Sequence, residues 1–223
     1  MSTMNSSTTA LPYYTRNEEI ANSVLHGIGA LLAIAGLVLL SLRAGGFLGG
    51  QSVDRLDLAS VIVFMTTMIA MFLISTIYHA VQHPGAKLIM RRLDHSVVFV
   101  FIAGTYTPLC LSGLGGVWGW SLFVFQWSMA LLGILRNIFS FKGLRRIEIA
   151  VYLLMGWSLV VGFVPLLRSV PRLSIILILA GGIAYTLGII FYRKKTIRFT
   201  HSIWHVFVLI GAICHWFAVW YFI

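Results

Sequence analysis

Charged residues are scarce in this chain of 223 amino acids, of which only 10% are charged and six are acidic. Soluble globular domains carry about 25% charged residues, so this composition excludes an ordinary soluble domain. Hydrophobic residues instead make up 59% of the chain, and the mean hydropathy is +0.94. The composition therefore predicts an integral membrane protein.

Cysteine and proline are also rare. The two cysteines, Cys110 and Cys214, lie inside apolar stretches, which excludes an exposed disulfide framework and predicts two small buried side chains. No Pro/Gly-rich linker or internal repeat divides the chain, so we expect one domain over residues 18–223. Residues 1–17 form a polar, Ser/Thr-rich tail without a basic segment or a cleavage site, and a cleaved signal peptide is not expected.

Long hydrophobic runs dominate the rest of the sequence. A membrane-spanning helix needs about 20 apolar residues, and continuous apolar runs without period-two alternation favour helices over a β-barrel. The sequence therefore predicts an all-α fold, a seven-transmembrane helix bundle. The seven predicted spans are 22–42, 56–80, 94–112, 117–135, 148–167, 173–192 and 201–222.

The net charge of +10 follows the loops of the predicted bundle. Twelve of the 16 basic residues fall in the tail and the second, fourth and sixth loops, and four fall on the other side. The positive-inside rule then places the N-terminus in the cytoplasm and the C-terminus outside. The basic residues therefore determine orientation, and some of them could contact anionic lipid headgroups. They give no indication of a nucleic-acid partner.

Ionisable residues within the spans are few, and each is a candidate functional residue because a charge in the bilayer is costly. With the N-terminus inside, odd-numbered spans begin and even-numbered spans end at the cytoplasmic face. Six polar residues then lie within about two helical turns of that face. They are Glu19, His26, His79, Asp94, His201 and His205. Spans one, two, three and seven are thus predicted to share one polar pocket.

The spacing of these residues places them on single helix faces, because residues three or four apart are neighbours on a helix. The three groups are His201 with His205, Ser75 with His79, and Glu19 with Asn22 and His26. Two histidines at i and i+4 commonly offer two imidazoles to one metal ion, and a third from a neighbouring helix completes a set of three.

Zinc is the preferred metal for imidazoles without thiolates, although iron, nickel and copper stay open. Three protein ligands with a free position are typical of catalytic zinc. Asp94 could then orient a water molecule or act as general base, and Ser75 could hydrogen-bond a ligand or the substrate. The alternative interpretation is that His79, His201 and His205 are hydrogen-bonded histidines of the core.

The remaining candidates receive plainer interpretations. His83 and His95 are expected to be interfacial or packing residues, and His215 lies too deep to join the metal ligands, which favours a core or pathway role. Glu148 begins the fifth span, and Arg145 and Arg146 beside it predict interfacial charge balance. The twelve basic residues predicted to lie on the cytoplasmic side are Arg16, Lys87, Arg91, Arg92, Arg136, Lys142, Arg145, Arg146, Arg193, Lys194, Lys195 and Arg198.

Five stretches carry a family resemblance in their order and spacing: "EIANSVLHGIGALLAIAG", "STIYHAV", "LDHSVVFVFIAGTYTP", "MGW" and "HSIWHVFVLIGAICHW". From about residue 18 to the end, the chain resembles the bacterial hemolysin III proteins, a branch of the progestin and adipoQ receptor family. Ser-x3-His, an Asp opening the third span and His-x3-His in the last span are also shared with the wider membrane-hydrolase superfamily that includes alkaline ceramidases.

The resemblance implies a seven-helix membrane protein with zinc near the cytoplasmic face, held by His79, His201 and His205. Ser75 and Asp94 match the serine and aspartate that accompany the ligands. The family's first-helix signature Glu-x2-Asn-x3-His is matched by residues whose role the resemblance leaves open. These residues are Glu19, Asn22 and His26.

Two functions are supported by these observations, and two others are not. The first is a zinc-dependent intramembrane hydrolase of lipid amides or esters that contributes to homeostasis of the bacterial inner membrane. The second is a non-catalytic, zinc-stabilised sensor or regulator. A pore-forming cytolysin lacks support in the sequence, and for a transporter no inverted repeat is found, although Pro108 and Pro165 permit kinks. Neither the substrate nor the oligomeric state follows from the sequence.

Overall fold

The fold is a bundle of long helices, seen in a computed structural model that describes residues 14–49, 52–139, 148–194 and 196–223. Within these residues, seven helical segments are long and apolar enough to cross a membrane, which confirms the predicted all-α, seven-span class. The elements are α1 (Arg16–Ala44), α2 (Arg55–Ala80), α3 (Pro84–Pro108), η1 (Leu109–Leu114), α4 (Gly116–Phe139), α5 (Glu148–Trp157), η3 (Ser158–Gly162), α6 (Phe163–Ser169), α7 (Arg172–Arg193) and α8 (Thr200–Phe222).

Two of the spans change helix type where the sequence contains proline. The third span runs from α3 into the π-helix η1 directly after Pro108, and Gly115, with a φ of 61°, ends it. The fifth span passes from α5 through the 3-10 helix η3 into α6, which contains Pro165. Proline removes a backbone donor and crowds the preceding turn, so the change of helix type accommodates it.

Helix starts extend two spans beyond the predicted apolar stretches. Thr15 forms a capping box with Glu18 and starts α1 at Arg16, so the last two residues of the predicted tail, Arg16 and Asn17, belong to α1. Residues 1–13 lie outside the described part of the chain. α3 begins at Pro84, capped by the His83 side chain, ten residues before the predicted span. A search for apolar runs does not detect the polar residues of a first helical turn, because that turn lies beyond the hydrocarbon core of the membrane.

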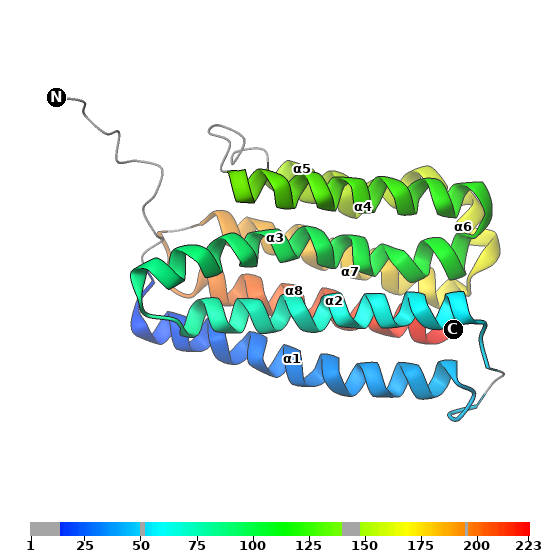
Figure 1. The fold of residues 1–223 in the computed structure, drawn as a ribbon, viewed down its shortest axis with the longest axis horizontal. Helices are drawn as coiled ribbons and strands as arrows, with labels where there is room; N and C mark the ends of the chain where they lie inside the picture. Colours follow the sequence, from blue (N-terminus) through cyan, green and yellow to red (C-terminus); the bar gives the residue numbers. More distant parts are fainter. Residues whose placement is uncertain (1–13, 50–51, 140–147, 195) are drawn as a thin grey trace.

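The helices lie side by side along one long axis (Figure 1), with α1, α3 and α8 beginning at the end where α2 and α7 finish. α1 packs against α2 and α8, α3 packs against α2 and α4, and α7 packs against α8. A core of buried apolar residues joins α1, α2 and α8, and within it Phe64, Met65 and Phe72 of α2 are almost fully buried. These contacts fix the relative positions of the three helices that carry the candidate site.

Close packing depends on small residues at helix contacts, as is usual in membranes. A Cβ on Gly104 of α3 would overlap the Thr67 side chain of α2, and one on Gly29 of α1 would lie 2.7 Å from the Phe72 ring. Where α1 and α8 both finish, Arg43 Nε donates a hydrogen bond of 2.7 Å to the carbonyl oxygen of Trp220. α1 is therefore held against α2 and α8 along its length.

A cavity of about 410 Å³ lies between α2, α3, α5, α7 and α8. Its lining is mostly apolar, and it extends from Tyr14 and His201 at one end of the bundle to Phe163 and Leu166 near the other. The candidate site lies at the first of these two ends.

Candidate metal centre

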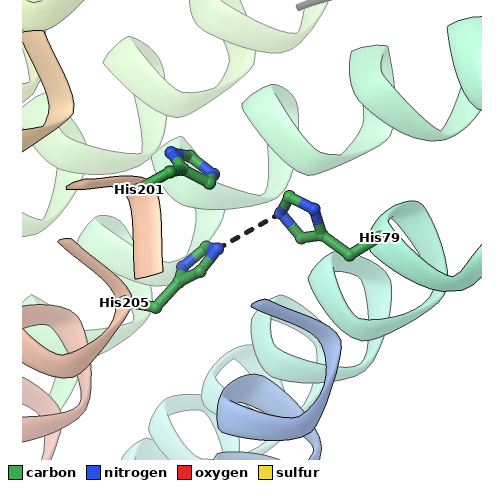
Figure 2. Close-up of side chains that lie close together, drawn as sticks. All are labelled: His79, His201 and His205. Atoms are coloured by element: carbon green, nitrogen blue, oxygen red, sulfur yellow. Dashed lines mark hydrogen bonds between the residues drawn. The ribbon is translucent and has the colours of Figure 1, made fainter. Parts of the chain in front are cut away.

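Three histidines meet at the end of the bundle where α2 finishes and α8 begins. His79 lies in the last turn of α2, and His201 and His205 lie one turn apart at the start of α8. Each offers one ring nitrogen, and the three nitrogens lie within 4.8 Å of one another. Figure 2 shows the three rings pointing toward a common centre. His79 and His205 are buried, with 0% and 3% of their surface exposed.

The geometry of the three histidines suits a metal ion. The Nε2 atoms of His79 and His205 are 3.2 Å apart. Two nitrogens bound to one tetrahedral zinc at about 2.0–2.1 Å would be separated by about 3.3 Å. His201 has its ring centroid 4.4 Å from that of His205 and 5.2 Å from that of His79. The three histidines could therefore hold a metal ion.

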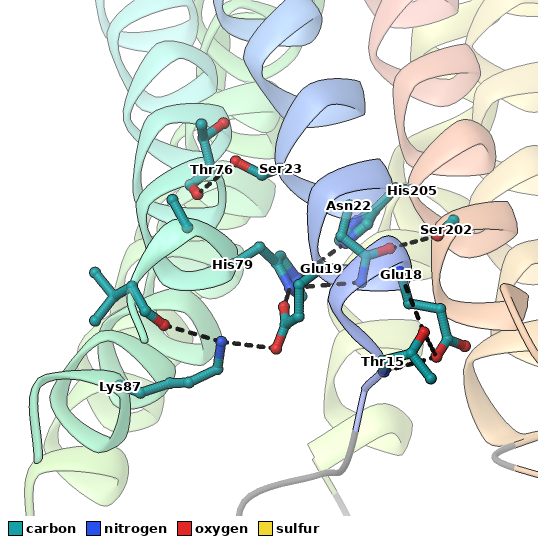
Figure 3. A network of polar contacts seen from close by, with 12 residues as sticks. Thr15, Glu18, Glu19, Asn22, Ser23, Thr76, His79, Lys87, Ser202 and His205 are labelled. Carbon is teal, nitrogen blue, oxygen red and sulfur yellow. Dashed lines mark hydrogen bonds and ion pairs between the residues drawn. The ribbon is translucent and has the colours of Figure 1, made fainter. Parts of the chain in front are cut away.

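Glu19 of α1 holds the opposite edge of the His79 ring. One carboxylate oxygen lies 2.7 Å from Nδ1 of His79, and the other lies 2.7 Å from Nζ of Lys87 in the first turn of α3 (Figure 3). Lys87 also donates to the carbonyl oxygen of Val81 at 3.1 Å. When the carboxylate accepts the Nδ1 proton of His79, Nε2 is left as the unprotonated nitrogen that a metal requires.

Asn22 connects α1 to α8 beside the same ring. Its side-chain oxygen accepts a hydrogen bond of 2.6 Å from the Ser202 hydroxyl, and its amide nitrogen lies 3.5 Å from Nδ1 of His79. Asn22 is fully buried. Figure 3 shows Glu19 and Asn22 reaching from α1 toward the histidines, so two of the three residues of the first-helix polar group contact His79 or its neighbours.

His26, the third residue of that group, lies against His205. The two ring centroids are 3.7 Å apart, and His26 is 3% exposed and lines the cavity. Among the described residues neither of its ring nitrogens has a hydrogen-bond partner. The structure places this imidazole beside the cluster but outside the group of three that shares a centre.

Ser75 and Asp94 line the same cavity as His201 and His205. Ser75 lies one turn before His79 on α2, is 1% exposed, and its hydroxyl has no partner in the described part of the chain. Asp94 of α3 is half-buried and is not a member of the group of three. Both side chains are therefore placed to face a molecule in the cavity.

Tyr14 is a residue of the site that the sequence did not indicate. Its ring stacks on His201 with centroids 5.0 Å apart and meets the His79 ring edge-on at 6.0 Å. Burial raises the pKa of the Tyr14 hydroxyl well above its ordinary value, so the phenol stays neutral. Lys87 and Ser202 were also missed, because neither has a spacing that distinguishes it from an ordinary loop or helix residue.

The other histidines have separate environments. His83 caps α3, accepting a hydrogen bond from the backbone N–H of Ala86. His95 lies 3.3 Å from Glu148, which also faces Arg136 at 3.7 Å. The charge of Glu148 is thus balanced by Arg136 of α4, while Arg145 and Arg146, its predicted partners, lie outside the described residues.

The fold and site together define a class: a multi-pass α-helical membrane protein with three clustered histidines at one end of an internal cavity. The model of the family described as "Haemolysin-III related" matches residues 14–216. The chain belongs to the haemolysin III family, as the sequence motifs indicated.

Curated relatives agree with this membership. The chain is 41% identical to the "Hemolysin-3 homolog" of Bacillus subtilis over 92% of its own length and 94% of the relative. It is 36% identical to "Hemolysin-3" of Bacillus cereus, with 92% of each chain covered. It is also similar to the human "Monocyte to macrophage differentiation factor", at 29% identity over 91% of this chain and 83% of the relative.

Proposed function

We propose that this protein is a zinc-dependent hydrolase of lipid amide or ester bonds that contributes to membrane homeostasis. The observation that carries the proposal is the convergence of three histidines, two of them buried and one half-buried, at one end of a mostly apolar cavity within the bundle. Three imidazoles suit zinc, and three protein ligands rather than four are typical of a catalytic zinc site.

Each polar residue then has a role. His79, His201 and His205 would hold the metal. When bound there, zinc lowers the pKa of a water molecule toward neutrality and polarises a carbonyl group. Asp94 accepts the proton of the attacking water and passes it to the departing nitrogen or oxygen, so that water adds across the bond and an acid and an amine or alcohol leave. Ser75 donates a hydrogen bond to the substrate carbonyl.

The cavity supports a lipid as the substrate. Its volume of about 410 Å³ lies within the usual range of about 300–1,000 Å³ for sites that bind small molecules. Apolar side chains line the part of the cavity that lies deeper in the bundle than the histidines. The exposed outer faces of the seven spans are also apolar. An acyl chain would lie in the cavity with its polar end at the histidines.

A second candidate is a non-catalytic sensor in which zinc is structural. This candidate is supported by the contacts that join the site to three helices: Glu19 and Asn22 of α1 meet His79 of α2, and Asn22 also meets Ser202 of α8. Loss of the metal would then loosen the packing of these helices rather than stop a reaction.

We further propose that the histidine end of the bundle faces the cytoplasm of a bacterial cell and that the protein resides in the inner membrane. Lys87, Arg91, Arg92 and Arg136 lie on helices that begin or finish at this end, together with Arg193. The distribution of basic residues supports this orientation through the positive-inside rule.

The experiment is complementation of a deletion strain followed by untargeted lipidomics. Wild-type protein should restore the lipid profile, and Asp94→Asn should keep its zinc but fail to restore the profile. Asp54→Asn is the matched control, because Asp54 only caps α2 at the opposite end and Asn caps equally well. Full restoration by Asp94→Asn would reject the hydrolase in favour of the sensor.

A further inference from the structure

A second polar group lies deeper in the cavity, apart from the histidine cluster. Tyr185 of α7 and His215 of α8 both line the cavity, with ring centroids 5.5 Å apart. His215 is ten residues beyond His205 on the same helix, which corresponds to a depth difference of about 15 Å. This pair therefore lies well inside the bundle, where polar groups are costly.

The contact between α7 and α8 is shaped to hold these two rings. A Cβ on Gly211 of α8 would lie 2.5 Å from the Tyr185 ring, and a Cβ on Gly181 of α7 would lie 3.0 Å from the His215 ring. The arrangement is reciprocal, because each ring packs over a glycine of the other helix. Gly181 precedes Tyr185 by four residues, and Gly211 precedes His215 by four residues. A side chain at Gly211 would overlap the Tyr185 ring and one at Gly181 would crowd the His215 ring, so the two glycines make room for the rings in the helix contact.

One polar atom of each ring is buried without a partner in the described part of the protein. The Tyr185 hydroxyl and Nδ1 of His215 are buried, and neither makes a hydrogen bond there, to the other or to a third group. His215 as a whole is only 8% exposed. A buried polar atom without a partner is destabilising, so the pair lowers the stability of the fold unless a bound molecule supplies the partner.

Three other hydroxyls on the cavity wall donate to backbone carbonyl oxygens. Thr105 donates to the carbonyl oxygen of Phe101 at 2.8 Å, Tyr106 to that of Gly156 at 2.6 Å, and Thr186 to that of Gly182 at 2.7 Å. Tyr185 and His215, by contrast, line the deeper part of the cavity with buried polar atoms that have no hydrogen-bond partner among the described residues.

We propose that Tyr185 and His215 form a second polar subsite that binds a hydroxyl group on the chain of a lipid in the cavity. A hydroxyl both donates and accepts, which suits a phenol and an imidazole that lie next to each other on the cavity wall. The depth of about 15 Å corresponds to about a dozen bonds of an extended chain with carbon–carbon bonds of about 1.5 Å. The inference rests on the proposed function only in placing the polar end of the lipid at the histidines.

The test compares two probes, octadecanoic acid and 12-hydroxyoctadecanoic acid, for binding to the purified full-length protein in detergent. The hydroxylated acid should bind about tenfold more tightly to the wild type, as expected for one or two added hydrogen bonds. In Tyr185→Phe, which keeps the ring over Gly211, the preference should fall toward equality while the affinity for octadecanoic acid stays unchanged. The His215→Leu variant should behave in the same way.

Thr105→Val is the matched control, because this substitution removes a cavity-wall hydroxyl that already has a partner. This variant should retain the tenfold preference. Equal affinities of the two acids for the wild type, no binding of either acid, or a preference that survives both Tyr185→Phe and His215→Leu would overturn the subsite. These outcomes are independent of the Asp94→Asn complementation, which tests hydrolysis.

Discussion

A carboxylate oxygen of Glu19 lies 2.7 Å from Nδ1 of His79, although the two residues are 60 positions apart in the chain. On the other side of the same ring, Nε2 of His79 faces Nε2 of His205 at 3.2 Å. Glu19 thus orients the imidazole and selects the form in which Nε2 is free to bind a metal. This contact assigns a positioning role to the first residue of the first-helix polar group.

Glu19→Gln is expected to lower zinc affinity by about 10- to 100-fold, the usual effect of losing a carboxylate behind a metal-binding histidine. The affinity can be measured by competition with a chromogenic chelator. Glu18→Gln is the matched control, because Glu18 contacts Thr15 and the backbone N–H of Phe199 rather than a histidine. Unchanged affinity in Glu19→Gln, or an equal loss in Glu18→Gln, would contradict the positioning role.

Helix packing gives a second prediction. Gly104→Ala should lower the free energy of unfolding by about 1–3 kcal/mol, because the added methyl group meets the Thr67 side chain, which is itself bonded to the carbonyl oxygen of Phe64. Thermal unfolding in detergent measures the effect. The same substitution at Gly156 meets no atom within 4 Å and should cost far less. Similar melting temperatures for the two variants would refute this account of the α2–α3 contact.

The orientation in the membrane gives a third prediction. In a background with Cys110 and Cys214 replaced by Ala, we expect a membrane-impermeant maleimide to label Arg168→Cys in spheroplasts and to leave Arg198→Cys unlabelled. Both positions are exposed, and they lie near opposite ends of the bundle. Labelling of Arg198→Cys alone would reverse the orientation inferred from the basic residues.

The meeting of the histidines could be expected from the sequence because it depends on two simple properties. Depth in the membrane follows from position in a span, and facing follows from the spacing of three or four residues. These properties place His79 level with His201 and His205. They do not say which neighbouring helix contributes a contact, so the roles of Glu19 and Asn22 stayed open until the packing of α1 against α2 and α8 was known.

Other parts of the site could not be predicted because they depend on helix ends and packing. Lys87 reaches Glu19 because α3 begins at Pro84, well before its apolar run. Tyr14 reaches His201 from outside the first predicted span. The pairing of Tyr185 with His215 depends on glycines of facing helices, and one sequence does not reveal which glycines face which rings. Contacts between helices, rather than patterns within them, complete the site.

The measurement that tests the central claim most directly is the zinc content of the purified protein, determined by mass spectrometry of the metal. The account predicts about one zinc ion per chain in the wild type and in His83→Ala, and loss of that zinc in His79→Ala, His201→Ala and His205→Ala at unchanged helical content. A wild-type protein without zinc after growth in zinc-containing medium, or full retention of zinc in any of the three variants, would contradict it.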